Sequence, residues 1–125
     1  MSTEIEPTKT VTIDHTKPLT VSVIVLSVHA ANYKIWIRDT ASDDWTLAAE
    51  GTTEDTVPDT KDIGVRPAGS SLFYWVGAAG PKKMRFKVQH VFQQDGKILK
   101  DGVIADEKDP DANGVAEVQR KVVFP

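Results

Sequence analysis

Hydrophobic and polar residues alternate with a period of two along much of this chain, which is the pattern of β-strands that bury one face. The clearest example is the stretch 82–100. Its apolar positions of one parity are Met84, Phe86, Val88 and Phe92. Asp95-Gly96 follows as a turn, because glycine tolerates positive φ and aspartate can bond its own backbone. This stretch is therefore predicted to be a β-hairpin.

The register of this hairpin has two solutions. A two-residue loop pairs Phe92 with Leu99. A three-residue loop with a glycine bulge pairs Phe92 with Ile98 instead. Only one of these two apolar partners can then face the core, and the sequence leaves the choice open.

The rest of the chain is predicted to form further short strands separated by turn residues. They are expected at 10–13, 19–29, 32–38, 45–50, 71–77 and 115–124, with another near Val65. The polar stretch 51–61 is predicted to be a long loop, since it is rich in Thr, Asp and Pro. Residues 1–8 are expected to form a loose leading segment.

These elements predict an all-β protein, because no amphipathic helix of about ten or more residues is recognisable. About eight or nine short strands without intervening helices are typical of a β-sandwich. We therefore predict a single-domain antiparallel β-sandwich over residues 1–125, Ig-like or jelly-roll-like, with a barrel as the nearest alternative.

Composition narrows the classes of function. The chain has 125 residues and no cysteine, so disulfides and thiolate sites are excluded. A net charge of -3 argues against general nucleic-acid binding, which needs a clustered positive surface. The amino terminus lacks the apolar run of a secretory signal, and no stretch reaches the roughly 20 apolar residues of a membrane span. We expect a cytoplasmic protein without a membrane span.

Charge is distributed unevenly along the chain. Residues 1–62 carry 5 Lys/Arg against 11 Asp/Glu, a net charge of -6, and residues 63–125 carry 10 against 7, a net charge of +3. These opposite signs either stabilise the fold internally or let an acidic patch on one copy meet a basic patch on another. The one concentrated positive cluster is Lys82, Lys83, Arg85 and Lys87. A homo-oligomer is thus one of the expected assemblies.

Tryptophans supply the first candidate site. Trp36 lies between two cations on the nominally polar face of its strand, and Trp75 shares a parity with Phe73 in a strand that is apolar on both faces. Aromatic rings pack on the C–H surface of sugars, and carboxylates accept hydrogen bonds from sugar hydroxyls. The candidate ligand-binding residues are Trp36, Trp45, Trp75, Asp43 and Asp44. Core filling or a protein interface would use the same aromatic residues.

An acidic loop supplies the second candidate site. Asp109, Asp111, Asn113 and the following glycine match the opening of a calcium loop, with oxygen ligands at alternate positions. The twelfth position is Arg120 where a bidentate glutamate is required, although Glu117 at the ninth position could supply an oxygen. The predicted metal ligands are Asp109, Asp111, Asn113 and Glu117. The alternative is an ordinary turn that binds no ion.

No catalytic residues are predicted, because no nucleophile, dinucleotide-binding or metalloprotease motif is present. His90 is expected in the core or at its rim, and Arg120 at a sheet rim with its charge in solvent. We therefore expect a non-enzymatic binding module, lectin-like, that binds a glycan through tryptophans and acidic loops. The alternative is a self-associating structural or protein-interaction sandwich. A third interpretation is a small enzyme using His15 or His90 with loop acids.

Overall fold

A computed structural model describes residues 5–53 and 57–125 and contains nine strands in that part of the chain. The strands are β1 (Glu6–Thr10), β2 (Pro18–Val25), β3 (Ala30–Arg38), β4 (Thr46–Thr53), β5 (Asp59–Val65), β6 (Ser70–Ala79), β7 (Phe86–Gln94), β8 (Lys97–Lys108) and β9 (Val115–Phe124). The described residues include no helix long and apolar enough to cross a membrane.

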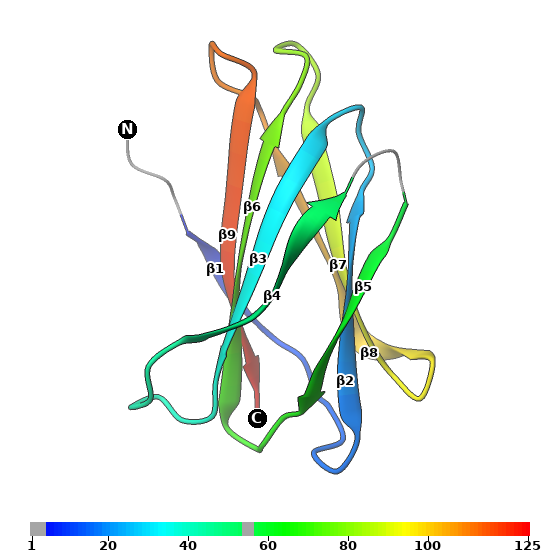
Figure 1. Cartoon of the computed structure of the whole chain (residues 1–125), viewed down its shortest axis with the longest axis vertical. Helices are drawn as coiled ribbons and strands as arrows, with labels where there is room; N and C mark the ends of the chain where they lie inside the picture. Colours follow the sequence, from blue (N-terminus) through cyan, green and yellow to red (C-terminus); the bar gives the residue numbers. More distant parts are fainter. Residues whose placement is uncertain (1–4, 54–56) are drawn as a thin grey trace.

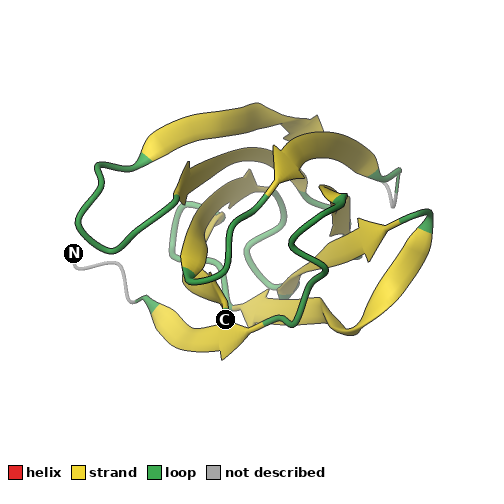
Figure 2. Ribbon diagram, turned by 90° about the horizontal axis from the view of Figure 1, so that it is seen from below, coloured by secondary structure: helices red, strands yellow, loops and turns green. Residues whose placement is uncertain are grey.

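The nine strands form two sheets that pack face to face, so the predicted β-sandwich is confirmed (Figures 1 and 2). One sheet has five strands in the order β1-β9-β6-β3-β4, and the other has four in the order β5-β2-β7-β8. All pairs are antiparallel except β1 with β9, which run parallel. Strands β3 and β6 occupy the middle of the five-stranded sheet and pair on both sides.

Two predicted loops are partly strand. β1 begins at Glu6, inside the segment 1–8 that was expected to be loose. Most of the predicted loop 51–61 belongs to the end of β4 and the start of β5, while its residues 54–56 lie outside the described residues. Both β4 and β5 are edge strands, which bury few side chains and therefore show little hydrophobic alternation.

The β7–β8 hairpin uses the two-residue loop. Gln94 pairs with Lys97, and both loop residues are left-handed, with φ of 55° at Asp95 and 72° at Gly96. This is the conformation of a type I′ turn, which matches the twist of the strands it joins. Beyond the pairing of Gln93 with Ile98 the register shifts and resumes with Val91 opposite Val103, while Leu99 packs against the core and Ile98 is 58% exposed. The first of the two predicted registers is therefore confirmed at the turn.

The inward face of β7 agrees with the sequence pattern except at its start. Phe86, Val88, His90 and Phe92 are fully buried. Met84 precedes the strand and is 47% exposed, so the prediction that it contributes to the core is wrong. The predicted strand began too early, because residues 82–84 form a turn that precedes β7.

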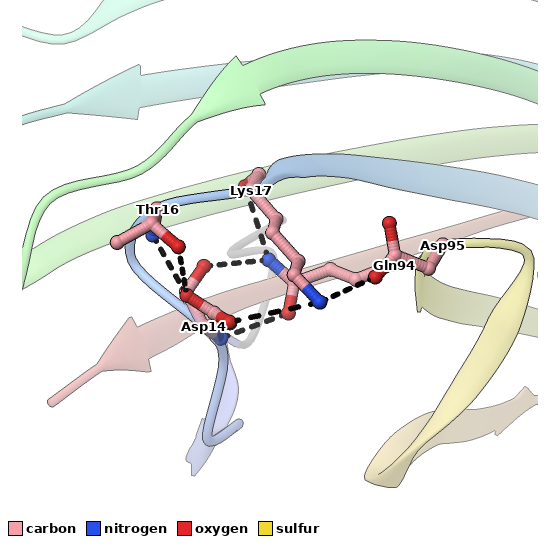
Figure 3. Close-up of polar contacts among 5 residues, drawn as sticks. All are labelled: Asp14, Thr16, Lys17, Gln94 and Asp95. Carbon is pink, nitrogen blue, oxygen red and sulfur yellow. Dashed lines mark hydrogen bonds and ion pairs between the residues drawn. The ribbon is translucent and has the colours of Figure 1, made fainter.

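Side-chain hydrogen bonds fasten this hairpin to the β1–β2 connection (Figure 3). The Gln94 amide accepts from the backbone N–H of Asp14 at 2.8 Å and donates to its carbonyl at 2.8 Å. It therefore replaces a strand partner for the N–H of Asp14, which would otherwise be unpaired, and adds a donor to the carbonyl, which also accepts from the backbone N–H of Lys17 at 3.3 Å. The Lys17 ammonium adds an ion pair with Asp95 at 2.6 Å.

Polar side chains join the two sheets near both lateral openings of the sandwich. At the β4 and β5 side, the Tyr33 hydroxyl donates to the Asp59 carboxylate. Burial, reinforced by Asp59, raises the pKa of Tyr33 above its usual range, so its hydroxyl remains a donor. At the β8 and β9 side, the Tyr74 hydroxyl donates to Asp106 at 2.5 Å.

Arg120 completes the second of these connections. Its Nε donates to the Tyr74 hydroxyl at 2.9 Å, and its Nη2 forms an ion pair with Asp106. The Arg120 side chain is only 6% exposed and that of Asp106 only 3% exposed. The expectation that Arg120 lies at a sheet rim is therefore wrong, because a buried counter-charge on the opposite sheet accommodates it.

Replacing Arg120 by Met is expected to lower the free energy of unfolding by about 3–5 kcal/mol, because Asp106 would be left buried without its counter-charge. Adding Asp106→Leu should recover much of that loss, since no uncompensated charge then remains. Urea unfolding followed by tryptophan fluorescence measures both changes. Lys121→Met, on the outer face of the same strand, is the control and should change stability by less than about 0.5 kcal/mol. Equal losses of stability in Arg120→Met and in Lys121→Met would contradict this explanation.

Candidate functional site

Aromatic side chains collect on the outer face of the five-stranded sheet, which points away from the four-stranded sheet. Trp36 on β3 lies directly across from Phe73 on β6, and Trp75 lies across from Lys34. Their neighbours of opposite parity, such as Tyr74, fill the core. The outward-facing rings of Trp36, Phe73 and Trp75 are half-buried, as is that of Trp45. We call Trp36, Trp45, Phe73 and Trp75 the aromatic face.

Three rings of the aromatic face touch one another. The centroid of Phe73 lies 6.1 Å from that of Trp36 and 6.0 Å from that of Trp45. Trp45 comes from the β3–β4 connection, and the guanidinium of Arg38 lies 4.2 Å from its ring centroid. This distance is that of a cation–π contact. The Arg38 Nε also donates to the Ser71 hydroxyl at 3.4 Å, so its guanidinium is held from two sides.

The ring of Trp75 lies over Gly77, its neighbour on the same face of β6. A Cβ atom at position 77 would come within 2.5 Å of the Trp75 ring, so the ring can occupy this place only because the residue is glycine. Trp75 borders two shallow depressions. The smaller has a volume of about 620 Å³ and extends to Trp36, with polar groups from Asn32, Lys34, Glu50 and Thr52 along it.

The larger depression has a volume of about 830 Å³ and also borders Trp75. It reaches the end of the sheet, where Val57, Pro58 and Glu117 border it. The aromatic face therefore continues on both sides into hollows that combine apolar walls with hydrogen-bonding groups, which is the usual character of small-molecule sites.

The structure places the predicted ligand-binding residues in two groups. Trp36, Trp45 and Trp75 lie on one surface, as their sequence positions suggested. Asp43 and Asp44 belong to the loop beside Trp45; the Asp43 carboxylate accepts from the backbone N–H of Thr40 at 3.1 Å, and Asp44 is exposed. Sequence reasoning did not select Phe73, although its shared parity with Trp75 was the signal that could have found it.

Two of the four predicted calcium ligands, Asp109 and Asp111, have other partners in the structure. Asp109 forms an ion pair with Arg85 at 2.7 Å. The Asp111 carboxylate accepts from the backbone N–H groups of Asn113 and Val115, at 2.8 and 3.1 Å, and so closes its own turn. Among residues 5–53 and 57–125, no three His, Cys, Asp or Glu side chains lie together as a metal site would require. Calcium binding stays a prediction from the sequence.

The cationic cluster at 82–87 is partly neutralised within the chain. Arg85 pairs with Glu107 at 3.2 Å as well as with Asp109, and Lys87 pairs with Glu107 at 3.6 Å. These acids belong to β8 and the loop that follows it. Arg85 and Lys87 are therefore less available to an acidic patch on another copy than the sequence suggested.

His90 is the most unusual titratable group of the core. Its ring stacks on Tyr74 with centroids 3.6 Å apart, and neither ring nitrogen has a hydrogen-bond partner. Complete burial lowers the pKa of His90 to about 3, against the opposing influence of the Asp106 carboxylate. His90 is thus neutral at physiological pH. It has no hydrogen bond to the Asp106 carboxylate and no exposed surface, so its position does not resemble that of a catalytic base.

His15 has the opposite electrostatic environment. Its Nδ1 lies 2.9 Å from the carbonyl oxygen of Arg66, and its Nε2 lies 2.8 Å from the backbone oxygen of Pro125. Both partners accept hydrogen bonds, so the ring satisfies them together only as an imidazolium that donates from both nitrogens. These two hydrogen bonds raise the pKa of His15 above its usual value. His15 connects three segments of the chain rather than facing a carboxylate.

Comparisons of the chain with protein-family models, curated proteins and solved structures give no match. The inference of function therefore depends on the chemistry of the surfaces described above. Of these, the aromatic face is the one that combines several large rings with adjoining hollows and polar groups.

The stability of the protein should fall as the pH decreases below about 6.5, in part because of His90. The unfolded chain takes up a proton near its ordinary pKa of 6.5, whereas the folded pKa is about 3. The unfolded state thus binds one more proton between these values. The free energy of unfolding should lose up to about 1.4 kcal/mol per pH unit from this residue.

His90→Phe, which keeps a flat ring against Tyr74, should remove that component of the pH dependence. Urea unfolding of both proteins at pH values between about 3 and 7 would measure how the free energy of unfolding changes with pH. This range is roughly the window between the folded and unfolded pKa values of His90. Identical slopes for the wild type and the variant would show that His90 is not the source.

Proposed function

We propose that this protein is a binding module that packs a carbohydrate against the aromatic face. The observation that carries the proposal is the position of Trp36 and Trp75 on the outer surface of the sheet, where the second sheet does not bury them. Large aromatic side chains left half-exposed on one face commonly mark a recognition surface. Sugar rings present flat C–H surfaces of matching shape.

Polar groups around the two tryptophans suit the hydroxyl groups of a sugar. Asn32 and Thr52 each offer a donor and an acceptor, Lys34 offers donors, and Glu50 offers acceptors. A sugar that left water for an apolar surface alone would lose its hydrogen bonds, at a cost of about 1–3 kcal/mol for each unsatisfied group. The hollow between Trp36 and Trp75 therefore supplies both requirements of carbohydrate binding, an apolar platform and nearby hydrogen-bonding groups.

The aromatic face is also rigidly supported. Trp36 and Trp75 belong to β3 and β6, which pair with neighbours on both sides in the middle of the sheet. A side chain on such a strand has little backbone freedom to lose when a ligand binds. This favours a preformed platform over a site assembled by moving loops.

Trp36→Ala and Trp75→Ala are each expected to weaken binding of the preferred glycan by about ten- to thirtyfold, because truncating an aromatic anchor costs about 1.4–2 kcal/mol. A glycan array identifies the ligand, and isothermal titration calorimetry gives the affinities. Leu26→Ala is the matched control, since Leu26 is 43% exposed beside the four-stranded sheet. Unchanged affinity in both tryptophan variants, or an array without a hit, would refute the proposal.

Self-association is the second candidate function, and the edge of the five-stranded sheet favours it. β4 pairs only with β3, and Leu47 on β4 is 46% exposed beside Trp36. A second copy that paired with this edge would extend both the sheet and its aromatic surface.

Under this alternative, static light scattering should give a mass above that of the single 13.7 kDa chain at high protein concentration. Leu47→Lys should return the mass to the monomer value, because a charged side chain on an edge strand opposes strand pairing. Lys97→Leu, at the start of β8, is a control that leaves the β4 edge unchanged. A monomer mass at every concentration would exclude this alternative.

A further inference from the structure

Cations surround the aromatic face and point to a more specific ligand. Lys34 and Arg38 lie two residues before and after Trp36, so all three side chains point outward from β3. Lys121 on β9 lies directly across from Phe73. None of these three cations forms an ion pair with another residue in the part of the chain that the structure describes.

Arg38 differs in this respect from the other arginines. The chain has Arg38, Arg66, Arg85 and Arg120. The last three pair with carboxylates, those of Asp39, of Glu107 and Asp109, and of Asp106. Arg38 alone has no carboxylate partner within residues 5–53 and 57–125, although Trp45 and Ser71 hold its guanidinium in place. Its two Nη groups, four N–H donors, have no described partner and remain available to an anion.

No acidic residue that the structure describes in this region forms an ion pair with Arg38. Glu50 lies across from Lys34 on the β4 edge, and Glu117 lies on β9 beside the larger depression. Asp43 and Asp44 precede Trp45, and neither forms an ion pair with Arg38. Positive charge therefore lies closest to Trp36 and Phe73, while Glu50 adds one carboxylate opposite Lys34 at the hollow between the two tryptophans.

We propose that the ligand is a polysaccharide containing uronic acid, whose sugar rings stack on Trp36 and Trp75 while its carboxylates bind Arg38, Lys34 and Lys121. This inference rests on the proposed carbohydrate-binding function. A guanidinium presents a planar pair of donors that matches both oxygens of a carboxylate. The steps of roughly 7 Å that separate Lys34, Trp36 and Arg38 along β3 place a cation on each side of a stacked ring.

The test compares acidic polysaccharides with neutral counterparts of the same linkage. Polygalacturonate, alginate and hyaluronan are titrated into the full-length protein by calorimetry, together with the carboxyl-reduced form of each. At least one acidic form is expected to bind about tenfold or more tightly than its reduced form, and added sodium chloride should diminish that difference by screening exposed charges. Equal affinity for each acidic and reduced pair, or no binding of any acidic form, would overturn the inference.

Charge-removing variants locate the carboxylate contacts. The double variant Lys34→Gln/Lys121→Gln should lower the ratio of affinities for the acidic and reduced forms by about tenfold. The double variant Lys34→Arg/Lys121→Arg should retain that ratio. Lys97→Gln with Lys100→Gln removes the same charge from the exposed β7–β8 hairpin and should leave the preference unchanged. A loss as large in this control pair would show that net charge alone is responsible, which would also overturn the inference.

The same experiment separates the two proposals. Equal binding of acidic and reduced forms that Trp36→Ala abolishes would leave carbohydrate binding intact and reject only the preference for uronic acid. Failure of every acidic, reduced and array glycan to bind would reject both.

Discussion

A sandwich of two sheets buries only one face of each sheet, and strand β6 carries large apolar residues on both of its faces. Leu72, Tyr74 and Val76 fill the core on the inner side, while Phe73 and Trp75 remain half-exposed on the outer side. Burying a large apolar side chain contributes roughly 1.5–3 kcal/mol, which these outer residues forgo in part. The aromatic face is the consequence of this constraint, and its exposure in the middle of a sheet is the observation from which we propose a ligand.

The orientation of that face depends on how the two sheets are held together. Apolar packing supplies most of the free energy but is tolerant of small shifts between sheets. Directional contacts at the two lateral openings restrict such shifts: Tyr33 with Asp59 on one side, and Arg120 with Asp106 on the other. Buried ion pairs contribute little net stability compared with apolar replacements, so their value here is better understood as fixing the arrangement of the sheets.

The period of two in the sequence was sufficient to predict the sandwich and to assign Trp36 to the nominally polar face of its strand, but it left open which face of the strand with Trp75 is buried. It could not predict that Arg120 is buried, because alternation assigns a residue to a face without showing which charged group lies opposite on the other sheet. It also missed the end of β4 and most of β5, whose edge positions require few apolar residues. The lack of a carboxylate partner for Arg38 among the described residues could not be predicted either, since it depends on the whole surrounding surface.

If the aromatic face binds a sugar as proposed, two kinds of structural element would contribute to recognition, the sheet and a loop. The floor, Trp36 and Trp75, belongs to strands paired on both sides, which suits the sequence-tolerant stacking of any flat apolar ring. The charge that distinguishes ligands depends partly on a loop, because Trp45 of the β3–β4 connection holds the Arg38 guanidinium. Changes in that loop would therefore reposition the cation while leaving the aromatic floor in place. Under the proposed function, affinity for sugar rings and selectivity among them would thus depend on separable parts of the fold, and selectivity could change without altering the sheet.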